Sequence, residues 1–209
     1  MKILAYSLGS LKTNCYFLIQ DSECIIIDPA DDASFILEEL LRKNLKLICM
    51  FATHGHYDHV MAAGEIQLSF NVPFYIHEKD MFLVDRLVET AHHFLGYNSH
   101  VIKPSNIKFI NITNEFQINN FKFQILHSPG HTPGSCCIYI KEEGVLLTGD
   151  TLFNQGIGDY LHSYSSKTEL IKSLKKLKKL PGETLAYPGH GDETILEEEK
   201  LQFNFVDFF

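Results

Sequence analysis

The stretch Thr53–His59, T-H-G-H-Y-D-H, places three histidines and one aspartate directly after an apolar run of five residues. Side chains alternate faces along an extended segment, so His54 and His56 are predicted to project to the same side and bind one metal ion. Asp58 and His59 lie where the chain leaves the strand and a helix is predicted to begin, so they suit a second ion beside the first. The stretch therefore predicts a metal site at the end of a strand.

This stretch resembles the T-H-x-H-x-D-H signature of the metallo-β-lactamase superfamily. Members of that family add three further ligands, each at a later strand end. The matching residues here are His131 in S-P-G-H-T-P-G, Asp150 in L-L-T-G-D-T and His190 in Y-P-G-H-G. The resemblance spans residues 1 to about 205 and fills all seven ligand positions with the expected chemistry.

The resemblance implies two neighbouring metal sites, each with ligands of its own, and one aspartate that binds both metals. The implied ligands are His54, His56 and His131 for the first site, Asp58, His59 and His190 for the second, and Asp150 for both. We expect two divalent cations, zinc first, although imidazole and carboxylate ligands also suit iron and manganese. The two carboxylates balance only part of the cationic charge, so the site is expected to attract an anion.

Each of these residues, taken singly, has a simpler interpretation. Asp58 also suits the N-cap of the predicted helix. His131 and Asp150 stand beside proline or glycine residues that are typical of turns, and His190 is compatible with an exposed histidine. However, four separated segments supply ligands in the expected order after apolar runs, and this joint pattern favours the metal-binding interpretation.

The predicted reaction is hydrolysis by a hydroxide that bridges the two metals. Zinc lowers the pKa of bound water to about 7, and Asp58 is placed to orient the hydroxide or to accept its proton. Within the superfamily, G-D-T-L-F at Gly149–Phe153, with Gly156 and Gly158, most resembles glyoxalase II-type thioesterases, so a thioester is the predicted substrate. A thiolate leaves unaided at neutral pH because the pKa of its conjugate acid is about 8.5.

Several alternative functions share this scaffold. A mononuclear iron persulfide dioxygenase would use only His54, His131 and Asp150, and the complete second site counts against it. A lactone or other ester hydrolase needs the same ligands as a thioesterase. The β-lactamase branch usually has a cysteine in place of the shared aspartate, and Asp150 counts against it. A protein that binds without catalysis is disfavoured because every ligand is intact.

The resemblance to glutathione-specific members ends where glutathione would bind. Those members carry a basic residue and a tyrosine where this sequence has Asp159 and Leu161, and a further tyrosine where it has Asp192. The sequence ends 19 residues after His190, without the basic helical extension of those enzymes. An acidic residue repels a carboxylate, so we expect glutathione thioesters to be poor substrates, with the loss mainly in KM.

The composition favours a single hydrolase domain over residues 1–209. The chain has 209 residues, a mass of 23.9 kDa and 45% hydrophobic residues, which is enough for one core. The cysteines are odd in number, form no C-x-x-C pair and follow no secretory signal, so we expect a reduced, cytoplasmic protein. Because most of the five cysteines lie in apolar runs, they are predicted to be small core residues: Cys15, Cys24, Cys49, Cys136 and Cys137.

The charge and hydropathy limit the partners. The net charge of −8 and the pI near 5.7 argue against nucleic acid, and no apolar run is long enough to span a membrane. A small-molecule thioester or ester is therefore the expected partner, and the oligomeric state stays open. The lysines of Lys172–Lys179 are predicted to form the solvated face of a helix that begins near Ser166. The phenylalanines of Phe203–Phe209 are predicted to pack against the core.

Periodicity predicts a layered α/β protein. The resemblance sharpens this prediction to the four-layer αβ/βα sandwich, in which the metals lie at one edge of two packed sheets. The segment Thr90–His100 is predicted to be a surface loop in which His92 and His93 are solvated, and a lid that faces the substrate is the alternative. Predicted strands cover residues 2–8, 13–20, 23–28, 46–52, 73–77, 107–112, 115–119, 121–127, 135–140, 144–149 and 184–187, and predicted helices include about 32–43, about 59–70, one from about 79, and two near the C-terminus.

Overall fold

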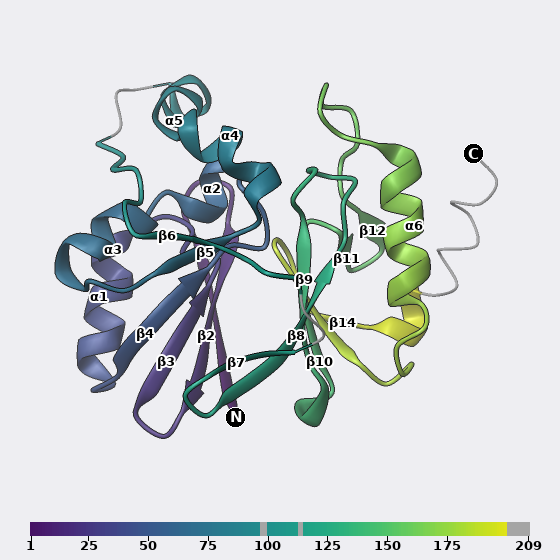
Figure 1. Cartoon of the computed structure of the whole chain (residues 1–209), viewed down its shortest axis with the longest axis horizontal. Coiled ribbons are helices and arrows are strands. Elements are labelled where there is room, and N and C mark those ends of the chain that lie inside the picture. Colours follow the sequence, from purple (N-terminus) through teal and green to yellow (C-terminus); the bar gives the residue numbers. More distant parts are fainter. Residues whose placement is uncertain (97–99, 113–114, 200–209) are drawn as a thin grey trace. The chain divides into compact units, whose positions relative to one another are not determined.

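The computed structural model describes residues 1–96, 100–112 and 115–199 (Figure 1). The chain divides into two compact units, Met1–Ile110 and Asn111–Phe209. Within each unit, described strands form a six-stranded sheet. The single domain expected over residues 1–209 stays a prediction. The phenylalanines of Phe203–Phe209 lie outside the described residues.

The sheet of the first unit has the strand order β1-β2-β3-β4-β5-β6. The strands β1, β2 and β3 pair antiparallel, whereas β3, β4, β5 and β6 pair parallel. The bounds are β1 (Lys2–Leu8), β2 (Thr13–Gln20), β3 (Glu23–Ile27), β4 (Lys46–Phe51), β5 (Phe74–Ile76) and β6 (Ile107–Phe109).

The helices of the first unit follow from caps and apolar spacing. The helix α1 begins at the N-cap Asp32, whose side chain accepts a hydrogen bond from the Phe35 N–H, and it buries Ile36 and Leu40 on one stripe. Figure 1 shows α1 and α3 side by side in this unit. The bounds are α1 (Ala33–Arg42), α2 (Tyr57–Val60), α3 (Ala63–Ser69), the 3-10 turn η1 (Glu78–Asp80), α4 (Met81–Asp85) and α5 (Leu87–Leu95).

The parallel pair β3 and β4 decides where the first predicted ligands lie. The carboxyl ends of parallel strands meet at the same edge of a sheet. Because β3 ends at Ile27 and β4 ends at Phe51, Asp28 and Thr53–His59 leave the sheet at one edge.

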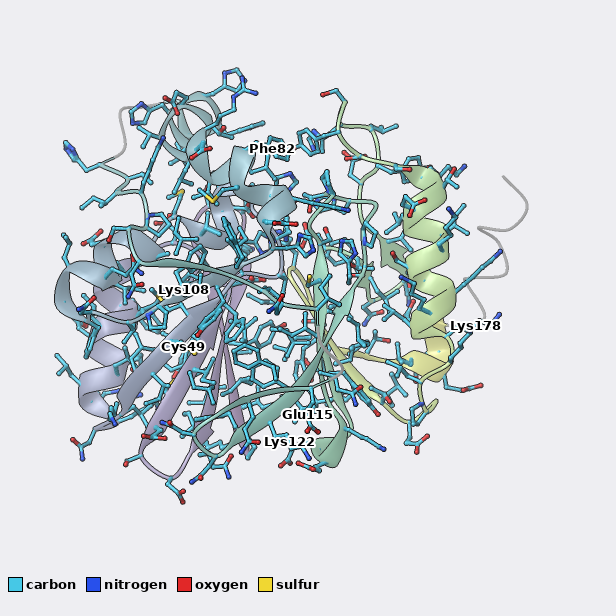
Figure 2. All side chains as sticks on the ribbon, in the orientation of Figure 1. Cys49, Phe82, Lys108, Glu115, Lys122 and Lys178 are labelled. Atoms are coloured by element: carbon cyan, nitrogen blue, oxygen red, sulfur yellow. The ribbon has the colours of Figure 1, made fainter. Side chains whose placement is uncertain are left out.

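The sheet of the second unit has the order β14-β13-β10-β9-β8-β7, and its parallel pair is β10 with β13. Asp150 and His190 follow these two strands. Beside the β7–β8 hairpin, Glu115 and Lys122 form an exposed ion pair at 2.9 Å (Figure 2), which contributes little to stability. The bounds are β7 (Phe116–Ile118), β8 (Phe121–His127), β9 (Cys136–Ile140), η2 (Lys141–Glu143), β10 (Val145–Gly149), β11 (Leu152–Phe153), β12 (Gly156–Ile157), α6 (Lys167–Leu177), β13 (Leu185–Pro188) and β14 (Thr194–Ile195).

All five cysteines are buried free thiols, which confirms that they serve as small core residues. Cys49, labelled in Figure 2, lies on β4. Burial raises the pKa of the Cys24 and Cys49 thiols far above neutrality, so both stay protonated and unreactive. No helix in the described part of the chain is both long and apolar enough to cross a membrane.

The helix predicted over about 59–70 begins two residues earlier and is interrupted. The N–H of Ala62 donates to the carbonyl oxygen of Ala30 at 2.9 Å, and the N–H of Ala30 donates to that of His59 at 3.0 Å. These bonds to the segment after β3 replace a helical bond and separate α2 from α3. Asp58 consequently lies in the first turn of α2, whose N-cap is His56, so the capping interpretation of Asp58 is wrong.

The prediction of a loop over Thr90–His100 is wrong for residues 90–95, because these six residues belong to the helix α5. Leu87 and Ala91 lie four positions apart and bury one stripe of this helix. It ends at Gly96, which adopts the left-handed conformation with φ 71. Residues 97–99 lie outside the described part of the chain.

Replacing Gly64 with alanine should destabilise the protein strongly. A Cβ atom at Gly64 would overlap the backbone carbonyl of Ile102, which cannot move as a flexible side chain would. We expect Gly64→Ala to lower the free energy of unfolding by about 3 kcal/mol, as overpacking does. Urea denaturation measures this change. The matched control is Gly156→Ala, whose Cβ meets its nearest atom at 3.8 Å, and equal stability of the two variants would contradict the prediction.

Candidate metal centre

The predicted ligands divide between the two units, and each group is described by itself. The first ligand group is His54, His56, Asp58 and His59, and the second ligand group is His131, Asp150 and His190. All seven are among the described histidine and aspartate residues that could hold a metal ion. In both groups every ligand is buried or half-buried.

The loop after β4 is held by two buried carboxylates. Asp28 accepts hydrogen bonds from the Thr53 N–H at 2.6 Å and from its hydroxyl at 2.7 Å. Asp80 accepts one from the Gly55 N–H at 2.9 Å. A Cβ at Gly55 would lie 2.9 Å from the backbone oxygen of Asp80, so only glycine lets the loop approach so closely. The loop therefore presents His54 from a fixed backbone.

Distances within the first ligand group suit metal coordination. His54 Nε2 and His56 Nδ1 are 3.0 Å apart, and Asp58 Oδ2 and His59 Nε2 are 3.5 Å apart. Two ligand atoms on one tetrahedral ion, each about 2.1 Å from it, are about 3.4 Å apart. The sequence analysis assigned His54 and His56 to one ion and Asp58 and His59 to the other. Each of these two pairs therefore has a separation that suits a shared ion.

Asp28 also fixes the orientation of a ligand. Its Oδ2 lies 2.9 Å from His59 Nδ1, and both side chains are almost completely buried. A carboxylate that accepts from Nδ1–H leaves Nε2 as the coordinating atom and raises its basicity. The sequence analysis missed Asp28. The available signal was a carboxylate directly after the apolar strand residues Ile25, Ile26 and Ile27.

Thr13 supports a second ligand in the same way. The Thr13 hydroxyl, buried at the start of β2, donates to Asp58 Oδ2 at 2.8 Å. This bond joins the Asp58 carboxylate to β2, which lies 45 residues away in the sequence. Tyr57 beside it stays protonated, because burial, with a smaller contribution from the Asp58 carboxylate, raises the pKa of its phenol.

The second ligand group has equivalent geometry. His131 Nε2 and His190 Nε2 lie 3.6 Å and 3.7 Å from Asp150 Oδ2. The His131 Nδ1 atom lies 2.8 Å from the backbone oxygen of Asp159, which leaves Nε2 for a metal. A Cβ at Gly158 would overlap the backbone oxygen of Asp150, so this glycine lets the chain pass next to a ligand.

The chemistry of the donors fits divalent metal ions. The seven side chains are five imidazoles and two carboxylates, a set that suits zinc, iron and manganese. In both His59 and His131 a hydrogen-bond partner at Nδ1 leaves Nε2 as the nitrogen that suits a metal. His127, at the end of β8, has its Nε2 atom 3.0 Å from the backbone oxygen of Pro133.

Residues 8–190, which include all seven predicted ligands, match the model of the metallo-beta-lactamase superfamily. The chain belongs to this superfamily.

Two relatives match along almost their whole length. The probable metallo-hydrolase YqgX of Bacillus subtilis (strain 168) is 33% identical over 211 residues, covering 100% of this chain and 99% of the relative. Hydroxyacylglutathione hydrolase GloC of Haemophilus influenzae is 33% identical over 211 residues, covering 99% of each chain.

Two solved structures are similar to the chain. The BLEG-1 B3 metallo-beta-lactamase has a TM-score of 0.89 and 31% identity, covering 98% of this chain and 99% of that chain. TTHA1623 in a di-iron-bound form has a TM-score of 0.84 and 30% identity, covering 94% and 96%. These similarities confirm the predicted metallo-β-lactamase fold. With the family match and the histidine-rich ligand set, they identify the chain as a metal-dependent hydrolase.

Replacing Asp28 with asparagine should weaken metal binding without unfolding the chain. Asparagine tolerates the left-handed conformation that Asp28 adopts (φ 51), but as a neutral amide it no longer raises the basicity of the His59 ring. We expect a loss of about 10- to 100-fold in metal affinity, measured by competition with a chelator. The matched control is Asp21→Asn, an exposed turn aspartate with φ 55. Wild-type affinity in Asp28→Asn would exclude a supporting role.

Proposed function

We propose that the two ligand groups bind two divalent metal ions and that the protein hydrolyses a thioester. The observation that carries the metal-binding part of this proposal is that each group, taken by itself, spaces its ligand atoms at 3.0 to 3.7 Å. The proposed ligands are His54, His56 and His131 for one ion, Asp58, His59 and His190 for the other, and Asp150 for both.

Support for the substrate class comes from the relatives. The hydroxyacylglutathione hydrolase of H. influenzae acts on a thioester by its name, and it matches this chain along its length. The di-iron form of TTHA1623 supports two ions in one chain and makes iron a candidate beside zinc and manganese.

The bound ions would polarise the substrate carbonyl and lower the pKa of a water molecule. The side chains of the protein would then position the attacking water and accept its proton. Thr13 holds Asp58 Oδ2, and we assign Asp58 to orient the attacking water and accept its proton. Asp28 holds the Nδ1 atom of His59, which leaves Nε2 as the nitrogen that would bind the metal. No general acid is required, because a thiolate leaves without protonation at neutral pH.

Hydrolysis of a β-lactam amide is the second candidate. The similarity to the BLEG-1 B3 metallo-beta-lactamase favours it and weakens the sequence argument that Asp150 counts against this branch. An amide nitrogen is a poorer leaving group than a thiolate and gains more from a proton donor. We therefore rank the thioester first.

Metal analysis tests the two-ion proposal. His190→Ala should reduce the metal content from two ions per chain to about one, because the second ion loses one of its own ligands. Asp150→Ala should reduce the occupancy of both sites, because Asp150 is the shared ligand. Elemental analysis of protein saturated with zinc measures the stoichiometry. His93→Ala, on the exposed side of α5, is the control. One ion in the wild type, unchanged in His190→Ala, would refute the proposal.

An activity comparison tests the substrate class. The wild type should hydrolyse a small thioester without oxygen, lose this activity to a chelator and regain it when zinc, iron or manganese returns. The same preparation is tested with glutathione persulfide, by oxygen uptake, and with a chromogenic β-lactam. Oxygen uptake or β-lactam cleavage without thioester cleavage would assign the chain to another branch of the superfamily.

A further inference from the structure

All three members of the second ligand group have a neighbour on or next to the β11–β12 hairpin. Asp150 comes two residues before β11, and the ring of Phe153 on β11 lies beside the His190 ring, with the centroids 6.3 Å apart. Asp159 comes two residues after β12, and its backbone oxygen lies 2.8 Å from His131 Nδ1. A shift of this hairpin would therefore move the surroundings of all three ligands together.

The hairpin has little stability of its own. Its strands contribute two pairs of residues to the ladder, Leu152 with Ile157 and Phe153 with Gly156. Gln155 in its turn adopts the left-handed conformation with φ 58, which is uncommon for a residue other than glycine. An isolated two-stranded hairpin is at best marginally stable in water. The hairpin therefore depends on contacts with the rest of the second unit for a fixed position.

A buried carboxylate supplies such a contact at the turn. Glu199 is 2% exposed and lies beyond residues 8–190, which match the family model. The backbone N–H of Gln155 donates to Glu199 Oε1 at 3.2 Å and to Oε2 at 3.1 Å. The hydroxyl of Thr194 on β14 donates to Oε1 at 2.8 Å. Because a buried carboxylate is costly without hydrogen bonds, these donors hold it between the turn and β14.

We propose that Glu199 is a positioning residue for the second ligand group. Its carboxylate holds the turn at Gln155, and the hairpin in turn holds the Phe153 ring against His190 and the Asp159 backbone against His131. Glu199 acts through this hairpin rather than through a bond to a metal. The inference rests on the metal-binding part of the proposed function and does not depend on which substrate is cleaved.

Zinc affinity measures this role. Glu199→Gln keeps the size of the side chain but replaces one acceptor oxygen with an NH2 group, which cannot accept the Gln155 N–H. We expect this variant to bind zinc about ten-fold more weakly in competition with a chelator, the lower end of the range for groups that support metal ligands. Thr194→Val should have a smaller effect. The double variant should be no weaker than Glu199→Gln alone, because both changes act through one carboxylate.

Two control variants separate positioning from general effects. Glu198→Gln makes the same change of charge at the neighbouring residue, which is exposed. Leu177→Ala opens a cavity beside α6, where Leu177 is 1% exposed, and so destabilises the same unit. Urea denaturation of the metal-free proteins ranks their stabilities. Both controls should keep the wild-type zinc affinity, and a loss in Leu177→Ala equal to that in Glu199→Gln would overturn the proposal.

Thioester cleavage is measured on the same preparations, so that the positioning role and the reaction are judged separately. Weaker zinc binding in Glu199→Gln, with both controls unchanged, supports the positioning role even if no preparation cleaves a thioester, in which case only the proposed substrate fails. Wild-type zinc affinity in Glu199→Gln, in protein that cleaves thioesters, overturns the positioning role and leaves the proposed function intact.

Discussion

The buried carboxylate of Asp28 joins the end of β3 to both segments that carry the first ligand group. It accepts from the N–H and hydroxyl of Thr53 and lies 2.9 Å from His59 Nδ1. A buried carboxylate is costly unless its oxygens are hydrogen-bonded, so an arrangement that separates β3 from β4 leaves the charge without compensation. The parallel register, the loop at Thr53 and the direction of the His59 ring are therefore fixed together.

The ligands were predictable because their chemistry is concentrated and their order is recognisable. Seven histidine and aspartate residues follow four apolar runs, and such runs can be identified as strands without knowledge of their partners. Asp28 was not predictable with the same methods. A single aspartate after a strand is common in turns, and its partner His59 lies 31 residues away, so the contact depends on the register of two parallel strands.

The errors in the predicted elements have a tertiary origin. Apolar spacing extends from α2 into α3. However, the Ala62 N–H donates to the backbone oxygen of Ala30 instead of to the preceding helical turn, so the helix is not continuous. The hairpin of β11 and β12 escaped prediction because strands of two residues are too short for alternation to be visible. In both places a neighbouring segment, rather than local propensity, decides the backbone conformation.

Thr13 begins β2 directly after the β1–β2 turn, and its hydroxyl reaches a carboxylate that lies 45 residues away in the sequence. A change in the length of this turn would move the hydroxyl relative to α2 and would leave Asp58 Oδ2 without this donor. The orientation of one predicted metal ligand therefore depends on a hairpin that supplies none of the seven ligands.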